Sequence, residues 1–571
     1  MTFDLLIKGG TVVDGTGLPG FRADVGITDG TITAIGDLKG QRAEQTIDAE
    51  GHVVAPGFVD GHTHMDAQQF WDPQGSNACW HGVTSVVMGN CGFTLAPCSE
   101  KDSDLVLHNL ERAEDIPRAA MKAGIPWSWT TFPEYYDVVD ALPKGLNYAS
   151  YVGHSSLRTH VMGKRAMEQT ATPEDLAAMK RELIAGMRAG AIGFSTSRSA
   201  AHRTPEGKPV ASRMASWDEF SQLVGVLKDL GSGIVEIARQ NIIEDPVERR
   251  EELDKLKRLA IDSGVPFTFG SSFYKRSAPD QWREQFHMVD ECNAHGGKML
   301  IQATATWNGS LRSFETATPY DFIPVWKDFR KLPLADQEKG LRDPVMRKKL
   351  VEAVHAHTHK PDPALPNLYQ RPVDWAWVFP ITQPLPPHPS IAEIATGRGQ
   401  DPVETFIDLA LDHHLKLFFV QPSNNEDQDF VRALIRHHHS VVTFSDAGAH
   451  VATTINPIHG HLLGHWVRDQ KAIELEAAIR KITLDIASFW GLEGRGWLRE
   501  GYHADVAVFD LDTISPSMPE LVYDLPAGGP RIKQHSQGMK ATVVNGQVTI
   551  RDGQHTGALP GRLLRGPLHH N

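Results

Sequence analysis

The sequence predicts an α/β protein, a (β/α)8 TIM-like barrel with a small β-sandwich domain formed by both chain termini. Apolar runs alternate with helical stretches over about 400 residues in the middle of the chain, a pattern typical of such a barrel. Both ends instead contain short strand-like runs separated by Gly and Asp turns. Because neither end alone can bury much core, we expect the two ends to form one domain. Two separate end domains are the alternative.

The predicted division has the first part of the β-sandwich at residues 1–56, the barrel at 57–490, and the second part with a tail at 491–571. Helices are predicted at 173–189, 217–230 and 246–263. The strand candidates are 52–59, 84–89, 147–153, 191–197, 233–238, 266–272, 298–306, 415–421 and 440–446. This is one more than a barrel of eight strands needs. Either the run at 415–421 or one of its neighbours therefore lies outside the barrel.

The interval from about residue 308 to 400 is rich in Pro, Trp and Phe and shows little periodicity. A long stretch of this kind in a compact domain is typical of a lid or binding insertion, so we expect it to lie over the barrel mouth. Its aromatic residues either line a binding pocket or form the core of the insertion itself. The aromatic residues in question are Trp307, Trp326, Trp375 and Trp377.

Composition excludes several classes of function. The 57 basic and 70 acidic residues give a net charge of -13, which disfavours a nucleic-acid surface because phosphate binding needs clustered cations. No window approaches the roughly 18 consecutive apolar residues of a membrane span, and no signal-like segment is visible. We therefore expect a cytoplasmic protein that acts without a membrane. Four cysteines in 571 residues do not make a disulfide framework.

The ends of the predicted strands carry the residues of a metal site. The first strand ends in His62 and His64, which point to the same side because side chains alternate along an extended chain. Cys91 follows the second strand between two glycines, and its thiolate would suit zinc, although a free cysteine is also commonly a buried apolar residue. Asp446 follows the last strand and can both ligate a metal and accept a proton from water.

Seven segments spread over nearly the whole chain carry a family resemblance. They are GFVDGHTHMD, GVTSVVMGNCGF, YVGHSSLR, GAIGFSTS, SDAGAH, REGYHADVAVFD and VVNGQVTIRDGQHTGALPGRLLR. These segments resemble the amidohydrolase superfamily and, within it, the N-acyl-D-amino-acid deacylase (D-aminoacylase) family. The resemblance implies a barrel with a β-sandwich and zinc-dependent hydrolysis of an amide. It also implies His62, His64, Cys91 and Asp446 as the metal-site positions.

The sequence departs from the family pattern at the fifth and sixth strands. There the family typically has a histidine at each strand end, and these hold a metal together with the cysteine. Here the fifth strand offers Glu236 and Arg239, the sixth offers no imidazole, and no lysine ends the fourth strand. We therefore expect one zinc ion held by His62, His64 and Asp446. Cys91 is then the fourth ligand or a ligand to a second ion, and Glu236 or His154 could substitute for the missing ligands.

The predicted function is metal-dependent hydrolysis of the amide bond of small-molecule N-acyl amino acids, of D configuration in particular. Asp446 is expected to act first as base and then as acid, and His154 to help stabilise the oxyanion. A guanidinium group matches the substrate carboxylate, and three arginines follow predicted strand ends: Arg158, Arg198 and Arg239. The alternatives are hydrolysis of a cyclic amide and a barrel without catalysis. Acyl chain, chirality, the number of metal ions and any homo-oligomer stay open at this point.

Overall fold

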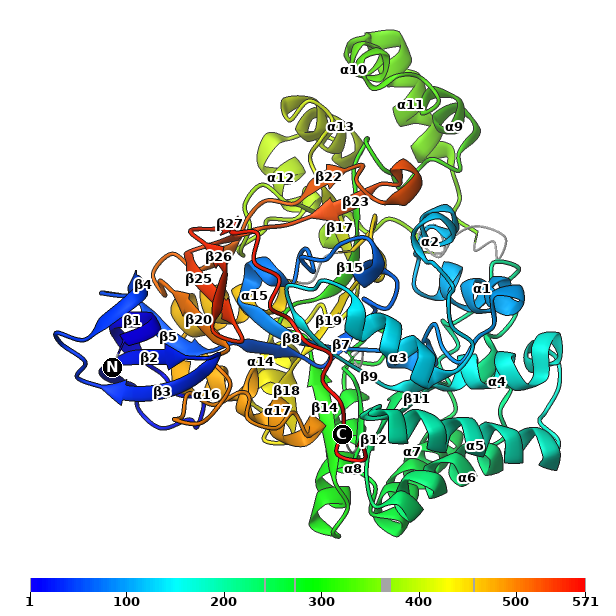
Figure 1. Ribbon diagram of the computed structural model, residues 1–571. Coiled ribbons are helices and arrows are strands. Elements are labelled where there is room, and N and C mark those ends of the chain that lie inside the picture. Colours follow the sequence, from blue (N-terminus) through cyan, green and yellow to red (C-terminus); the bar gives the residue numbers. More distant parts are fainter. Residues whose placement is uncertain (1, 241–242, 272–273, 361–370, 455–456, 570–571) are drawn as a thin grey trace.

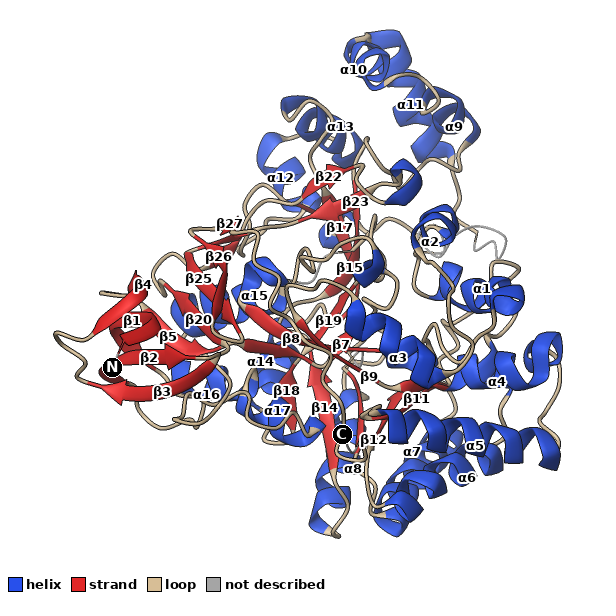
Figure 2. Ribbon diagram, in the orientation of Figure 1, coloured by secondary structure: helices blue, strands red, loops and turns tan. Residues whose placement is uncertain are grey.

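The computed structural model describes residues 2–240, 243–271, 274–360, 371–454 and 457–569. Figure 1 shows strands from the two ends of the chain lying side by side on one flank of the molecule. Most of the long helices lie on the other flank, around a set of parallel strands, as Figure 2 shows. A group of short helices, α9 to α13, projects away from both parts.

Parallel strands follow one another in chain order through the middle of the protein. They form two parallel sheets: β6 pairs with β8 and β8 with β9 in the first, and β10 pairs with β11 in the second, which continues through β12, β13, β14 and β18. The bounds are β6 Phe58–Asp60, β8 Val83–Met88, β9 Asn147–Ser150, β10 Val152–Gly153, β11 Gly193–Ser197, β12 Ile234–Ala238, β13 Phe267–Gly270, β14 Met299–Ala303 and β18 Ser440–Val442. Finally β19 (Phe444–Ala447) pairs in parallel with β7 (His62–Thr63), so the end of the series returns beside its beginning.

Three predicted helices begin and end where the sequence indicates. These are α5 (Pro173–Ala189), α6 (Trp217–Leu230) and α7 (Pro246–Ser263). Each is preceded by a Thr, Ser or Asp whose side chain accepts a backbone N–H, and each is followed by a glycine with positive φ, which are the usual N- and C-terminal signals. Other helices packed around the strands are α4 His154–Met162, α8 Trp282–Ala294, α14 Gln428–Arg436, α16 Leu475–Lys481 and α17 Leu484–Trp490.

Strands from both termini form one nine-stranded sheet. Its N-terminal members are β1 Thr2–Val12, β2 Phe21–Thr28, β3 Thr31–Gly36, β4 Arg42–Asp48 and β5 Val53–Pro56. Its C-terminal members are β20 Val506–Phe509, β25 Met539–Val544, β26 Gln547–Arg551 and β27 Gln554–His555. The two sets meet where β5 pairs with β1 on one side and with β20 on the other. The last strand before the parallel series is therefore held by both ends of the chain.

The run predicted at 415–421 lies outside the parallel series. It overlaps β17 (Phe419–Asn424), which pairs antiparallel with β15 (Asn308–Arg312) and β16 (Phe379–Pro380) in a separate three-stranded sheet. This sheet joins the insertion to the rest of the protein. The helices of the insertion and of the segment after it are α9 Pro324–Phe329, α10 Leu334–Arg342, α11 Pro344–Ala356, α12 Ile391–Arg398 and α13 Pro402–Asp412. Residues 361–370 of the predicted insertion lie outside the described residues.

The insertion has a hydrophobic core of its own. Trp326 is completely buried in this core, and its indole N–H donates to the carbonyl of Leu350 at 3.0 Å. Trp375 packs against the same core, and Trp307 stacks on Phe379. The tryptophans of this segment therefore hold the insertion together, whereas the strand ends of β15 and β17 reach the cavity described below.

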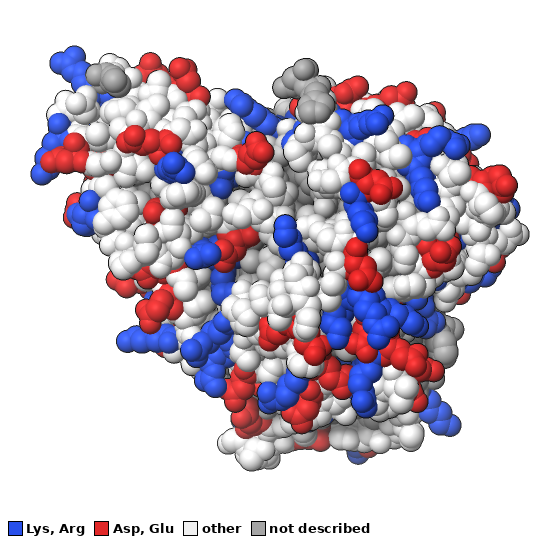
Figure 3. All heavy atoms as spheres, turned by 90° about the horizontal axis from the view of Figure 1, so that it is seen from below, with Lys and Arg blue, Asp and Glu red and all other residues white. Residues whose placement is uncertain are grey.

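Two features of the surface bear on the classes of partner. Among the described residues, no helix is both long enough and apolar enough to cross a bilayer. On the face shown in Figure 3, Lys and Arg side chains are interspersed with Asp and Glu, without a broad basic area of the kind that binds nucleic acid.

Candidate metal centre

A cavity of about 320 Å³ opens where the parallel strands end. It is bounded by strand ends, by the loops that follow them and by the base of the insertion. The titratable residues in its lining that matter most below are His62, Cys91, Glu114, His202, Glu236 and Asp446. The volume lies in the range of ordinary small-molecule sites.

Four side chains predicted to hold a metal are brought together here. Asp446 Oδ1 lies 3.3 Å from His62 Nε2 and 3.6 Å from His64 Nε2. Cys91 Sγ lies 3.6 Å from His62 Nε2. Zinc bonds of about 2.0–2.3 Å in a tetrahedron place neighbouring ligand atoms about 3.3–3.6 Å apart. Each of these three separations is therefore one that two ligands of a single zinc ion can have, and one ligand atom each from His62, His64 and Cys91 lies within 4.8 Å of the other two.

The ring of His62 is oriented by a residue that the sequence analysis does not identify. His62 Nδ1 lies 2.5 Å from Gln302 Oε1, on β14, and the amide oxygen can only accept a hydrogen bond. The proton of the neutral ring is therefore on Nδ1, and Nε2 presents its lone pair to the cluster. Metal-binding histidines commonly have such a partner on their second nitrogen.

Electrostatics act in different directions on these side chains. Burial lowers the pKa of His62, but Asp446, Glu236 and Gln302 raise it, and the net pKa lies above its ordinary value. Burial raises the pKa of Asp446, but the hydrogen bond and charge of His62, with His64 and His450 nearby, lower that pKa to about 2, so the carboxylate is ionised. Burial lowers the pKa of His64 well below its ordinary range, which keeps that imidazole neutral. Burial and three nearby carboxylates raise the pKa of the Cys91 thiol, so this group becomes a thiolate when a cation is bound beside it.

The backbone is held in an unusual conformation at the cluster. Cys91 has φ 58° and Asp446 has φ 56°, the left-handed region that residues other than glycine seldom adopt. Such conformations cost about 1–3 kcal/mol each and gather at functional sites. The fold therefore holds Cys91 and Asp446 in backbone conformations that these residue types seldom adopt on their own.

Buried polar atoms without hydrogen-bond partners also indicate that a divalent metal ion binds at this cluster. Several buried polar atoms around the cluster have no hydrogen-bond partner among the described residues: both ring nitrogens of His64, Oε1 of Glu114 and Oε1 of Glu236. Buried polar groups are nearly always paired, so unpaired nitrogen and oxygen atoms around one point indicate a ligand. Nitrogen, carboxylate and thiolate donors together suit zinc.

Comparison with known proteins agrees with this chemistry. A family model described as "Amidohydrolase family" matches residues 45–550. The chain belongs to the amidohydrolase family. It is 28% identical to the D-aminoacylase of Alcaligenes xylosoxydans xylosoxydans, over 98% of this chain and 97% of the relative. It is also 28% identical to the N-acyl-D-glutamate deacylase of the same organism, over 98% of this chain and 96% of that one.

Solved structures show the same fold. A crystal structure of D-aminoacylase matches this amidohydrolase with a TM-score of 0.66 and 24% identity, over 99% of this chain and 100% of that one. The N-acyl-D-glutamate deacylase of Bordetella bronchiseptica, complexed with zinc and a phosphonate inhibitor, matches with a TM-score of 0.65 at 24% identity, over the same shares of the two chains. The resemblance stated from the sequence motifs is confirmed.

His154 lies outside the cavity of this amidohydrolase. Its Nδ1 is 2.8 Å from Thr196 Oγ1 and its Nε2 is 2.9 Å from Glu219 Oε1. Thr196 points away from the neighbouring Ser195, whose hydroxyl bonds to the loop after β8 on the interior side. His154 therefore lies between the strands and the helix layer. With both nitrogens engaged there, it is not placed to stabilise an oxyanion or to ligate the metal.

Two of the three predicted arginines are likewise engaged elsewhere. Arg158 is completely buried and bonds to both carboxylate oxygens of Glu219, at 2.6 and 2.5 Å. Arg198 pairs with Glu252 at 2.9 Å and stacks over Trp217. Neither lines the cavity, so neither is placed to meet a substrate carboxylate.

Arg239 is the predicted arginine that does line the cavity. It follows β12, its Nη1 donates to Gln285 Oε1 at 2.5 Å, and its guanidinium lies over the ring of Phe269. Burial lowers its pKa to about 9, so it remains a cation at neutral pH. A fixed cation at the edge of the cavity therefore comes from the fifth strand.

Other residues of the site were missed or only considered in the sequence analysis. Glu236, considered as a substitute ligand, lies beside the cluster: its Oε2 accepts the Cys91 N–H at 2.6 Å. Glu114 and His202 line the cavity without having been predicted. His202 comes five residues after Ser197, the end of β11, and a position just beyond a strand end is a weak sequence signal for a site residue. Glu114 follows a helix, so its position in the sequence gives no such signal.

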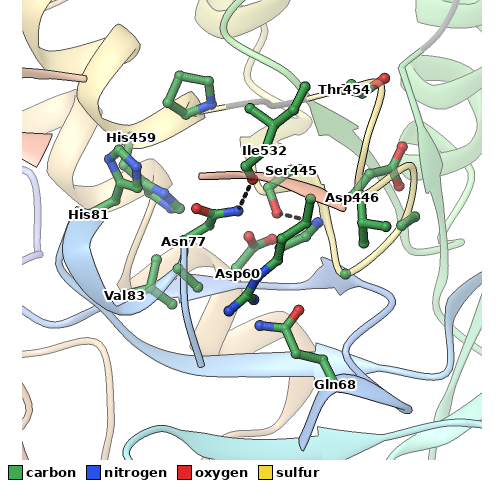
Figure 4. Close-up of a pocket in the computed structure, with 17 residues that line it drawn as sticks. Asp60, Gln68, Asn77, His81, Val83, Ser445, Asp446, Thr454, His459 and Ile532 are labelled. Carbon is green, nitrogen blue, oxygen red and sulfur yellow. Dashed lines mark hydrogen bonds between the residues drawn. The ribbon is translucent and has the colours of Figure 1, made fainter. Parts of the chain in front are cut away.

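A smaller cavity of about 50 Å³ lies behind the strand that carries His62. Figure 4 shows His81 and His459 together at one side of it and Asp446 at the other. Asp60 faces this space, accepts the backbone N–H of His62 at 3.2 Å, and has its pKa raised to about 7 by burial. Asp60 therefore supports the ligand strand from behind.

Proposed function

We propose that this amidohydrolase is a zinc-dependent deacylase that hydrolyses the amide bond of N-acyl amino acids, N-acyl-D-amino acids in particular. The observation that carries the proposal is the cluster of His62, His64, Cys91 and Asp446, of which His62, Cys91 and Asp446 line a cavity of small-molecule size. The names of the relatives, D-aminoacylase and N-acyl-D-glutamate deacylase, support the substrate class.

We also infer the finer fold from the strand pairings. The parallel series, which returns from β19 to β7, supports a closed (β/α)8 barrel at residues 57–490. The sheet shared by both termini supports a single β domain from residues 1–56 and 491–571.

In this proposal His62, His64 and Asp446 hold the zinc ion, with Cys91 as a further ligand. A bound ion would act as a Lewis acid that polarises the scissile carbonyl and makes water more acidic. Asp446, ionised and at the edge of the cavity, accepts the proton of the attacking water and later passes it to the departing amine. Arg239 would bind the substrate carboxylate. His154 has no role in this mechanism, because its ring contacts Glu219 on the helix side of the strands.

The test is hydrolysis of a matched panel of N-acetyl-D- and N-acetyl-L-amino acids by zinc-loaded protein, with the released amine measured directly. We expect turnover of D substrates that stops when a chelator removes the metal. Asp446→Asn should lower turnover by at least about 100-fold. The matched control Asp290→Asn, which changes a half-exposed carboxylate beside His437, His438 and His439, should not. A zinc-loaded protein that cleaves cyclic amides and none of the N-acyl amino acids would refute the proposed substrate class.

A further inference from the structure

A second set of metal-ligand side chains lies against the first. One ligand atom each from Cys91, Glu114 and His202 falls within 4.8 Å of the other two, and so do those of His62, His64 and Cys91. Cys91 belongs to both sets. Its partners in the second set come from unrelated parts of the chain, since Glu114 follows α1 (Ser103–Ala113) and His202 lies in the loop after β11. The three residues are far apart in the sequence and meet in the fold at the cavity.

Glu114 is a buried carboxylate that faces both sets. Its side chain is 3% exposed, with Oε2 3.4 Å from His64 Nε2 and Oε1 4.0 Å from His202 Nε2. Within the part of the chain that the structure describes, Oε1 has no hydrogen-bond partner. Burying a carboxylate without a full set of partners is costly unless a cation compensates it. In the described part of the chain no lysine or arginine forms an ion pair with Glu114, which leaves the position of a compensating cation open to a metal ion.

His202 is oriented as a metal ligand. Its Nδ1 lies 2.7 Å from Ser197 Oγ, which also accepts the N–H of Ser199 at 3.2 Å. A serine oxygen can accept two hydrogen bonds, so a proton on His202 Nδ1 satisfies this contact. The lone pair of Nε2 then faces Glu114, and the second nitrogen is held by a polar partner, as in known metal sites.

The fifth and sixth strands carry no histidine that could complete a second site. No histidine occurs between residues 203 and 286, a range that includes the ends of β12 and β13. The imidazole of His202 reaches the thiol of Cys91 from the fourth strand's loop instead. Nitrogen, carboxylate and thiolate donors in one small group suit a borderline divalent ion.

We propose that Cys91, Glu114 and His202 form a second divalent-cation site that takes zinc and shares the Cys91 thiolate with the first site. The inference rests on the proposed function in one respect, because Cys91 is also assigned to the metal centre of the hydrolase. In this arrangement the centre binds two ions through side chains from three loops and two strands. Glu114 lies between His64 and His202.

The test counts metal ions on the full chain. Metal-free protein is titrated with Co²⁺, with the cobalt–thiolate absorption recorded, and zinc per chain is measured separately by elemental analysis. The wild type should bind two ions, and the thiolate band should rise through both equivalents. His202→Gln and Glu114→Gln should each bind one ion tightly and weaken the second at least tenfold. The matched control is His450→Gln, another histidine lining the same cavity, which should still bind two.

Three results would overturn the second site: one ion in the wild type, two in His202→Gln, or loss of an ion in His450→Gln. Circular dichroism verifies that each variant is folded, and His202→Cys, which restores a donor, should recover the second equivalent. The count is independent of turnover. Two bound ions without hydrolysis would reject the proposed function and keep the site, whereas hydrolysis with a single bound ion would keep the function and reject the site.

Discussion

Replacing Arg158 with methionine should destabilise the protein by about 3 kcal/mol while leaving substrate binding intact. The guanidinium is completely buried and donates to Glu219 at 2.6 and 2.5 Å and to the carbonyls of Ala166 and Gln169 at 3.2 and 2.7 Å. Removing one partner of a buried ion pair costs about 3–5 kcal/mol, because the other charge stays buried. His154 still bonds to Glu219, which places the expected loss at the lower end.

The loss should depend on pH in a defined direction. Burial raises the pKa of Glu219, but hydrogen bonds and charges from His154 and Arg158 lower the pKa further, so the net pKa is below its ordinary value. A carboxylate whose pKa is lower in the folded state stabilises the protein above its unfolded pKa of about 4.3. That contribution is lost as pH falls through the folded pKa. The difference between wild type and Arg158→Met should therefore be largest near neutral pH and shrink in acid.

Urea unfolding followed by tryptophan fluorescence measures the effect. With a slope of about 3 kcal/mol per M or more for a large chain, the midpoint should fall by up to about 1 M. The matched control is Arg118→Met, which removes partly exposed pairs with Asp104 and Glu111 and should barely move the midpoint. If Arg158→Met instead keeps the wild-type midpoint and raises KM tenfold, then Arg158 binds substrate and its structural role is refuted.

Further predictions concern the metal and the substrate. Gln302→Leu removes the acceptor for His62 and should weaken zinc binding about 10–100-fold in chelator competition; unchanged affinity would contradict its role. Asp446→Asn should lower kcat by about 10²–10⁴-fold, and a variant with zinc bound and near-normal kcat would remove Asp446 as the base. Arg239→Met should raise KM about 10–100-fold for a substrate with a free carboxylate, and much less for the same substrate as its methyl ester; equal effects would exclude carboxylate binding. Chelation should lower the melting temperature, and added zinc should restore it.

The helices could be predicted because local signals and tertiary packing agree. In α5, α6 and α7 a capping residue, an apolar period and a terminal glycine indicate the same bounds, and the structure confirms them. The run at 415–421 shows the limit of such patterns. Its leucines and phenylalanines are buried, as an apolar run indicates, but burial does not specify which sheet a strand joins.

The candidate site could be predicted where its residues follow strands. His62, His64, Cys91 and Asp446 come from that rule, and the structure brings them together. The same rule misplaces His154, because this residue begins helix α4 and its ring contacts Thr196 and Glu219 on the helix side of the strands. Glu114 and His202 lie in loops whose path depends on packing of the whole protein, so no local pattern identifies them.

The sheet shared by the two termini has a consequence for synthesis on the ribosome. β5 ends at Pro56, and its partner β20 begins at Val506, about 450 residues later. At about 5–20 residues per second, the ribosome needs roughly 20–90 s to make the intervening chain. During that time one edge of β5 has no partner, beside the strand that leads into His62 and His64. β5 therefore becomes paired on both sides only near the end of translation, so a nascent chain that stalls before Val506 should be especially prone to proteolysis and aggregation.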